Sequence, residues 1–307
     1  MKKLICALLL LALALQPLSG LAAAKIPSLP KELTLTAGQF QLFSQGFTGV
    51  WESSDPAVAG AEADVNDKKN VRLIGFSAGE ATLTLTGTRT NKTAQVKVTV
   101  LPDESADDPV PDVIQRVIDI ATDEWIAVGG QAMSKDTKSN KYVKWWGYGN
   151  IGWCGAFAGY CLDTAGVPLE KEDDIRKLKP LTNGDPHGIK AAGVPKIDTG
   201  YTNLGRTTKI PRPGYLVIYG SVKDAYGYKH VGIVTDVKDY GEGLYKVTTV
   251  EGNMGSTVKS YCYLYDARNV EHQNLSPIPR EEQTEPNVNY TPHQNTWYVT
   301  EFCATWY

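Results

Sequence analysis

Two cysteines, Cys154 and Cys161, stand seven residues apart in the stretch "NIGWCGAFAGYC" (150–161), where thiols could form a disulfide, bind a metal or supply a nucleophile. The Ala-rich run from Cys154 ends in Ala165-Gly166, which predicts a helix closed by a glycine cap. Seven helical residues rise by about 10.5 Å, whereas a disulfide needs Cα atoms within about 7 Å. The two thiols therefore cannot bridge each other within one helix, and no paired C-x-x-C supports a shared zinc.

The two cysteines are predicted to differ in role. Residues seven apart share a helix face, so Cys161 fits a small apolar residue of the buried face, with a disulfide to Cys262 or Cys303 as the alternative. Cys154 lies in the first helical turn, where the partial positive charge of the helix N-terminus favours a thiolate. The alternative for Cys154 is a buried structural thiol. A general base elsewhere in the chain would favour the interpretation of Cys154 as a nucleophile.

A base and an orienting group follow Cys154 in the chain. Of the four histidines only His230 begins a predicted strand, "HVGIVTDV", in which Gly232 leaves room for a partner beside the imidazole. In "TTVEGNMG", Glu251 and Asn253 are two apart and would face the same side of an extended strand. Glu251 could fix the imidazole tautomer, and Asn253 could do the same or hold an oxyanion. The order Cys, His, Glu/Asn is typical of cysteine hydrolases.

Metal chemistry is disfavoured by the same histidines. They show no H-E-x-x-H or comparable ligand spacing, so we expect neither a metal nor another cofactor, and a metal-dependent amidase is the less favoured reading.

The N-terminal segment has the composition of an export signal. Lys2 and Lys3 precede an apolar run over 4–15, and Ala22–Ala24 offer an A-x-A cleavage site. The run is short for a membrane span, so an uncleaved anchor is only the alternative. We predict a signal peptide over 1–24 and an exported mature chain without a transmembrane segment.

Residues 25–101 are predicted to form an all-β unit. Alternating runs such as "AQVKVTVL" are separated by Gly, Pro and Asn-Asp turns, which is typical of a small β-sandwich. The stretches "VWESSDPAVAG" (50–60) and "LIGFSAGEATLTLTG" (73–87) resemble bacterial Ig-like (BIG) domains. The resemblance implies an Ig-like sandwich that serves as a spacer or as a binding module with cell-wall or carbohydrate contact.

The remaining chain is predicted to form a second domain over 112–307, after a Pro- and acid-rich linker over 102–111. "DVIQRVIDIATDEWI" has the apolar period of an amphipathic helix and opens this domain. Residues 274–296 are polar and Pro-rich, which predicts a loop. "TWYVTEFCATWY" then predicts an edge or barrel strand, with core packing as the favoured role of its aromatic residues.

The charge of the chain disfavours polyanionic partners. The formal net charge of −3 becomes more negative once residues 1–24, which hold two lysines and no acids, are removed. No basic block suggests a nucleic acid or an anionic membrane surface as a partner.

Four stretches in order resemble the CHAP family of cysteine, histidine-dependent amidohydrolases/peptidases, which is papain-like and related to NlpC-type peptidases. They are "GWCGAFAGYCLDTAGV", "IPRPGYLVIYG", "KHVGIVTDV" and "TTVEGNMG", within about residues 112–270. The resemblance implies an α+β fold in which the helix of the nucleophile packs on an antiparallel sheet that carries the histidine. Cys154 would be the nucleophile, His230 the base, Glu251 its orienting group and Asn253 a second polar member. Where the family commonly has Pro-Gly-Asp, this chain has Tyr215.

The resemblance also implies a function. We expect a secreted or cell-surface bacterial hydrolase that cleaves amide bonds of peptidoglycan, as an N-acetylmuramoyl-L-alanine amidase or as a stem or cross-bridge endopeptidase. Four aromatic residues before the helix are candidates to line its groove: Trp145, Trp146, Tyr148 and Trp153. Tyr148 could donate to the oxyanion, but a groove-lining or packing role is favoured for it. A secreted protease acting on ordinary proteins and an inactive cell-surface binding protein are the alternatives.

Overall fold

The computed structural model describes residues 26–64, 67–181, 183–223, 227–291, 293 and 296–307. The predicted signal peptide over 1–24 therefore lies outside the described residues. Within the described chain, no helix is both long enough and apolar enough to cross a membrane.

The N-terminal β region contains two sheets around one core. Alternating apolar residues face inward from both sheets, and side chains such as Val71, Leu83 and Val98 are fully or almost fully buried there. This confirms the predicted all-β unit, while its Ig-like assignment stays a prediction. The first sheet has the order β1 (Glu32–Thr36), β7 (Thr93–Leu101), β6 (Gly79–Gly87), β3 (Gly49–Ser53), and the second β2 (Phe40–Ser44), β5 (Asn70–Gly75), β4 (Ala59–Ala63).

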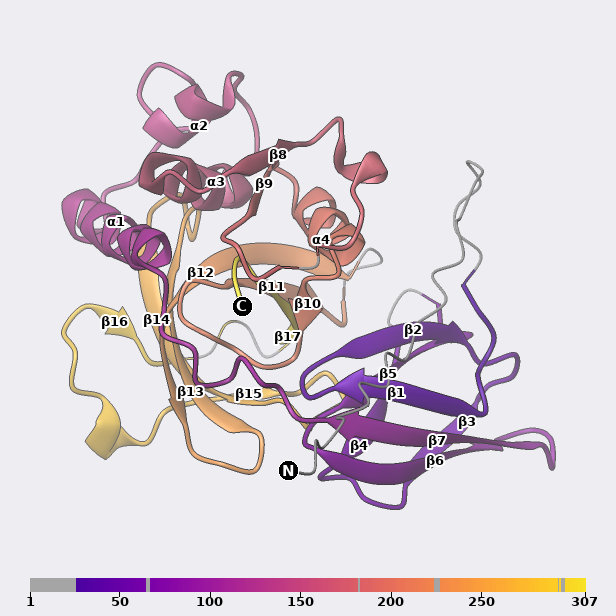
Figure 1. Ribbon diagram of the computed structural model, residues 1–307. Helices are drawn as coiled ribbons and strands as arrows, with labels where there is room; N and C mark the ends of the chain where they lie inside the picture. The colour runs from indigo at the N-terminus through magenta and orange to yellow at the C-terminus, as the bar shows by residue number, and fades with distance from the viewer. Residues whose placement is uncertain (1–25, 65–66, 182, 224–226, 292, 294–295) are drawn as a thin grey trace, which may run out of the picture.

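The C-terminal region has helices packed on a large antiparallel sheet, as the mixed α+β prediction requires. Figure 1 shows α1 and α3 lying across one side of this sheet. The helices are α1 (Asp112–Val128), α2 (Lys141–Trp146), α3 (Cys154–Ala165) and α4 (Val194–Asn203). The sheet has the order β10 (Thr207–Thr208), β17 (Trp297–Cys303), β11 (Leu216–Ser221), β12 (Tyr228–Asp239), β13 (Leu244–Glu251), β14 (Lys259–Asp266), β15 (Leu275–Ser276).

Smaller elements complete this region. β16 (Val288–Asn289) pairs in parallel with β14, and β8 (Leu169–Lys171) pairs with β9 (Gly188–Lys190). Two short 3-10 turns lie at Ile175–Lys177 and Arg280–Glu282. The polar segment 274–296 is mostly loop, as predicted, although it contributes the short strands β15 and β16.

The last strand corrects one prediction. β17 does not lie at the edge of the sheet, because β11 pairs on one side of it and the short β10 on the other. The aromatic end of the chain packs in the core: the Trp306 ring is buried beside Tyr215, with ring centroids 6.0 Å apart.

The predicted linker over 102–111 contains no helix or strand, yet its start is held in place. Arg212 pairs with the Asp103 carboxylate at 2.6 Å and donates to the Ser105 carbonyl at 2.7 Å. The start of the connecting segment is therefore tied to the C-terminal region.

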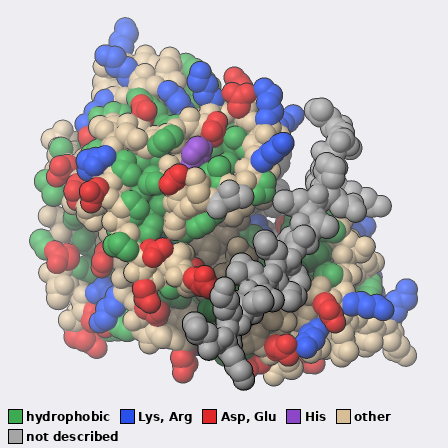
Figure 2. Space-filling view, in the orientation of Figure 1, with side chains coloured by type: hydrophobic (Ala, Val, Ile, Leu, Met, Phe, Trp, Pro, Cys, Tyr) green, Lys and Arg blue, Asp and Glu red, His purple; other side chains and the backbone are tan. Residues whose placement is uncertain are grey.

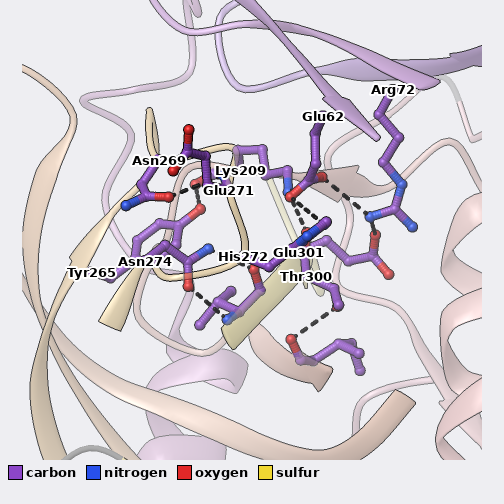
Figure 3. A network of polar contacts seen from close by, with 12 residues as sticks. Glu62, Arg72, Lys209, Tyr265, Asn269, Glu271, His272, Asn274, Thr300 and Glu301 are labelled. Atoms are coloured by element: carbon purple, nitrogen blue, oxygen red, sulfur yellow. Dashed lines mark hydrogen bonds and ion pairs between the residues drawn. The ribbon is translucent and has the colours of Figure 1, made fainter. Parts of the chain in front are cut away.

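A buried network of charges also joins the two regions (Figure 3). Lys209 Nζ lies 2.8 Å from Glu62 Oε2 and donates to the Thr300 carbonyl at 2.6 Å. Arg72, from β5, lies 3.2 Å from the Glu301 carboxylate of β17. On the outside, by contrast, acidic and basic side chains are interspersed over the face drawn in Figure 2.

Candidate active site

Close backbone contacts fix the start of α3. A Cβ on Gly155 would lie 2.5 Å from the Ala192 carbonyl oxygen, and a Cβ on Gly252 would lie 2.4 Å from Phe157 Cβ. Both distances are shorter than real Cβ contacts, so only glycine lets these segments approach so closely. Cys154 is the first residue of the helix, which ends at Ala165 with Gly166 in the left-handed region (φ 91°), as predicted.

The two cysteines of α3 have the separate environments that helix geometry predicts. The four cysteines that the structure describes are free thiols, so Cys161 forms no disulfide with Cys262 or Cys303. Cys161 is fully buried in the core, and burial raises the pKa of its thiol well above the usual value. Cys161 is therefore a packing residue, and a bridge is ruled out as its role.

The Cys154 thiol is influenced directly by His230 of β12, which acts on its pKa through a hydrogen bond and through charge. Burial opposes ionisation of this thiol, but the hydrogen bond and charge of His230 outweigh burial and lower the pKa of Cys154. Hydrogen bonds from the backbone of Val231 and Gly155 act in the same direction. The environment thus favours a thiolate at the N-terminus of α3.

His230 lies between the thiol and a carboxylate. Its Nε2 is 3.0 Å from Glu251 Oε2 on the neighbouring strand β13, an ion-pair distance without the alignment of a hydrogen bond. Burial would lower the pKa of His230, but its interactions with the Cys154 thiol and with the charge of Glu251 outweigh burial and raise it to about 10. A protonated imidazole is therefore favoured beside the thiolate.

Gly232 leaves room beside the imidazole as predicted, and the partner that uses this room is Glu251. A Cβ at this position would lie 2.6 Å from Glu251 Cγ, so the space beside the imidazole is occupied by the Glu251 side chain. The missing side chain of Gly232 lets the carboxylate of β13 reach across β12 to His230.

Glu251 is fully buried and is held by several donors. Its Oε1 accepts from Tyr219 Oη at 2.7 Å, from Thr249 Oγ1 at 2.7 Å and from His293 Nε2 at 3.1 Å. Burial would raise the pKa of Glu251, but His293 and His230 outweigh burial and hold it below the usual range of a carboxyl. His293 is the residue that sequence reasoning missed: it lies in the Pro-rich segment, and no local spacing links it to Glu251.

Asn253 departs from the predicted arrangement. β13 ends at Glu251, and Asn253 lies in the following turn with φ 64°, so strand alternation does not place it beside Glu251. Its side-chain nitrogen instead lies 3.7 Å from where a Cβ on Gly152 would be, next to the segment that leads into Cys154. The Asn253 side chain therefore lies beside Gly152, two residues before Cys154.

The aromatic residues before α3 are only partly placed as expected. Trp153 is fully buried and stacks on Tyr142, with ring centroids 5.4 Å apart, so it cannot line a substrate groove. Tyr148 is 61 % exposed and contacts the half-buried Trp146, with ring centroids 5.6 Å apart. Of the expected aromatic lining, Tyr148 is thus the member most open to solvent.

Among the described residues, no group of three or more His, Cys, Asp and Glu side chains is placed to hold a metal ion. A thiol beside an imidazole that in turn faces a carboxylate is the arrangement that cysteine hydrolases use.

The comparison with protein families agrees with this class. Residues 143–253 match the CHAP domain, and the matched segment contains Cys154, His230, Glu251 and Asn253. No family match covers the N-terminal β region. A search of the curated proteins gave no match for the chain. A CHAP domain implies amidase or peptidase activity of the kind found in cell-wall hydrolases, and it suggests a cysteine amidohydrolase.

Proposed function

We propose that this chain is a secreted bacterial cysteine hydrolase that cleaves amide bonds of peptidoglycan. One observation carries the proposal: His230 lies 3.0 Å from the Glu251 carboxylate and acts on the Cys154 thiol at the start of α3, whose pKa it lowers. All three side chains are at least nine-tenths buried, so the charges act on one another with little screening by water.

In the proposed reaction, the Cys154 thiolate attacks the carbonyl carbon of the scissile amide and forms a tetrahedral intermediate. Backbone N–H groups at the start of α3 stabilise its oxyanion, because they point out of the helix N-terminus. The His230 imidazolium gives its proton to the leaving amine, and a thioester with Cys154 remains. His230 then takes a proton from a water molecule, which attacks the thioester and releases the acid and the thiolate.

Glu251 keeps the imidazole ring oriented and its charged form favoured, and it is not itself protonated in this cycle. Asn253 supplies a second polar group near Gly152, on the approach to the thiol. The predicted signal peptide supports a substrate outside the cytoplasmic membrane. The CHAP match supports peptidoglycan as that substrate. For the β region we propose contact with the cell wall or its carbohydrate.

The test uses the mature chain, Cys154→Ala and Cys161→Ala, each incubated with purified peptidoglycan. New termini are identified by mass spectrometry. Cleavage by the wild type and Cys161→Ala, but not by Cys154→Ala, is expected, because Cys161 is a packing thiol on the same helix. Lactyl groups freed from L-Ala would identify an amidase, and new stem or cross-bridge amines an endopeptidase.

Equal product from Cys154→Ala and the wild type would overturn the nucleophile assignment. A parallel digestion of casein covers the protease alternative: casein cleavage without peptidoglycan cleavage would replace the proposed substrate. An absence of cleavage in both assays would leave the binding-protein alternative in place of the hydrolase.

A further inference from the structure

His293 contacts the site from outside the segment that matches the CHAP domain. It lies 42 residues beyond Glu251, ahead of β17, yet its Nε2 is 3.1 Å from Glu251 Oε1. Its side chain is nearly as buried as that of Glu251, at 2 % and 0 % exposed. The chain therefore brings a second imidazole to the carboxylate that faces His230.

The two oxygens of Glu251 have different surroundings. Oε1 accepts from Tyr219, Thr249 and His293, whereas Oε2 is the oxygen that faces His230 at 3.0 Å. An ionised carboxylate only accepts hydrogen bonds, so the Nε2 of His293 must carry a proton at this contact. Three donors on one oxygen fix the rotation of the carboxylate and leave the other oxygen for the catalytic imidazole.

Aromatic rings hold His293 in this position. Tyr219 of β11 packs edge-on against it at 4.6 Å between ring centroids, and Tyr261 of β14 lies at 4.2 Å. Trp297 of β17 lies at 4.9 Å. The titratable groups that face His293 are Glu251 of β13, His230 of β12, and three tyrosines of β11 and β14: Tyr219, Tyr261 and Tyr263.

We propose that His293 is a positioning residue of the hydrolase, which donates from Nε2 to Glu251 Oε1 and so keeps Oε2 directed at His230. The proposal rests on the proposed function only for its effect on turnover. Its effect on the Cys154 thiolate does not depend on any substrate, because Glu251 supports the charged imidazole that stabilises the thiolate.

The test measures the rate at which iodoacetamide alkylates Cys154 as a function of pH, by peptide-resolved mass spectrometry. In His293→Phe the donor is lost while a ring remains, so the midpoint for thiolate formation is expected to rise by about one pH unit. In His293→Gln an amide nitrogen can take the place of Nε2, so the midpoint should stay near that of the wild type.

Turnover gives the second readout. A hydrogen bond to a charged group is strong enough that His293→Phe should lose about tenfold or more in kcat, with little change in KM. His293→Gln should recover most of that loss. If the wild type cleaves no substrate, the proposed function fails, while the alkylation midpoints still decide the role of His293.

His187 provides a matched control, because its Nε2 lies 3.1 Å from Glu170 Oε1, outside the site. His187→Phe should leave the alkylation midpoint unchanged. Circular dichroism verifies folding, and if His293→Phe does not fold, His293→Asn replaces it, since its shorter amide falls short of Oε1. Equal midpoints in the wild type and the donor-deficient variant, or an equal rise in His293→Gln or His187→Phe, would overturn the proposal.

Discussion

At the scale of single residues, the site consists of Glu251, His230 and Cys154, and the charge of each group affects the protonation of its neighbour. Cys154 and the Glu251 carboxylate raise the pKa of His230, and His230 in turn lowers the pKa of Cys154. Because thiol and imidazole titrate as a pair, an experiment reports apparent values of the pair rather than of either residue. The interactions among these groups nevertheless fix the direction in which the protonation of each one changes with pH.

We predict that hydrolysis and alkylation of Cys154 separate at high pH. The pKa of His230 is raised to about 10, so the imidazolium that protonates the leaving amine is lost as the pH rises through about 10. The thiolate persists there, so hydrolysis should fall while alkylation continues. Glu251→Gln should move the fall in hydrolysis to lower pH, because the neutral amide no longer supports the imidazolium. Parallel pH profiles of kcat/KM and of alkylation measure both effects, and a joint fall of the two rates in the wild type would contradict the prediction.

At the scale of elements, features set by local interactions could be predicted from the sequence, and features set by tertiary packing could not. The start and end of α3 follow from local composition, and helix geometry excludes a bridge between its two cysteines; both predictions agree with the structure. Strand alternation failed at Asn253, because β13 ends two residues earlier and a left-handed turn follows. His293 could not be found because only tertiary packing brings a distant loop to Glu251, and Trp153 is buried because it stacks on Tyr142.

The pairing of β12 and β13 gives a prediction at this scale. Gly232→Ala places a Cβ 2.6 Å from Glu251 Cγ, so the carboxylate must move away from His230. A displacement of about 1 Å at a catalytic group costs on the order of 100-fold in rate, and a loss of this order in kcat/KM is expected. The matched control is Gly193→Ala, where the nearest atom to the new Cβ lies 4.0 Å away on Lys196. Retention of full activity by Gly232→Ala would show that Glu251 does not require the free space at Gly232 to act on His230.

At the scale of the whole molecule, the β region and the C-terminal region are joined by buried charges rather than by the connecting segment alone. Lys209 and Glu62 are each 2 % exposed, and Arg72 links the β region to Glu301 of β17 (Figure 3). β17 pairs directly with β11, which in turn pairs with the strand of His230. The junction is thus continuous with the sheet that carries the site.

This junction gives the last prediction. Glu62→Ala leaves the Lys209 ammonium buried without its closest carboxylate, and breaking a buried pair in this way costs about 3–5 kcal/mol. Burial already lowers the pKa of Lys209 although Glu62 opposes this effect, so the variant should also lose its proton more readily. Calorimetry should show a lower unfolding temperature for Glu62→Ala, and the double variant Glu62→Leu with Lys209→Met should recover much of the loss because no unpaired charge remains.

Glu80→Ala, which breaks the exposed pair with Lys97, is the control and should change stability by less than about 1 kcal/mol. Equal stability of Glu62→Ala and Glu80→Ala would mean that the network does not hold the two regions together.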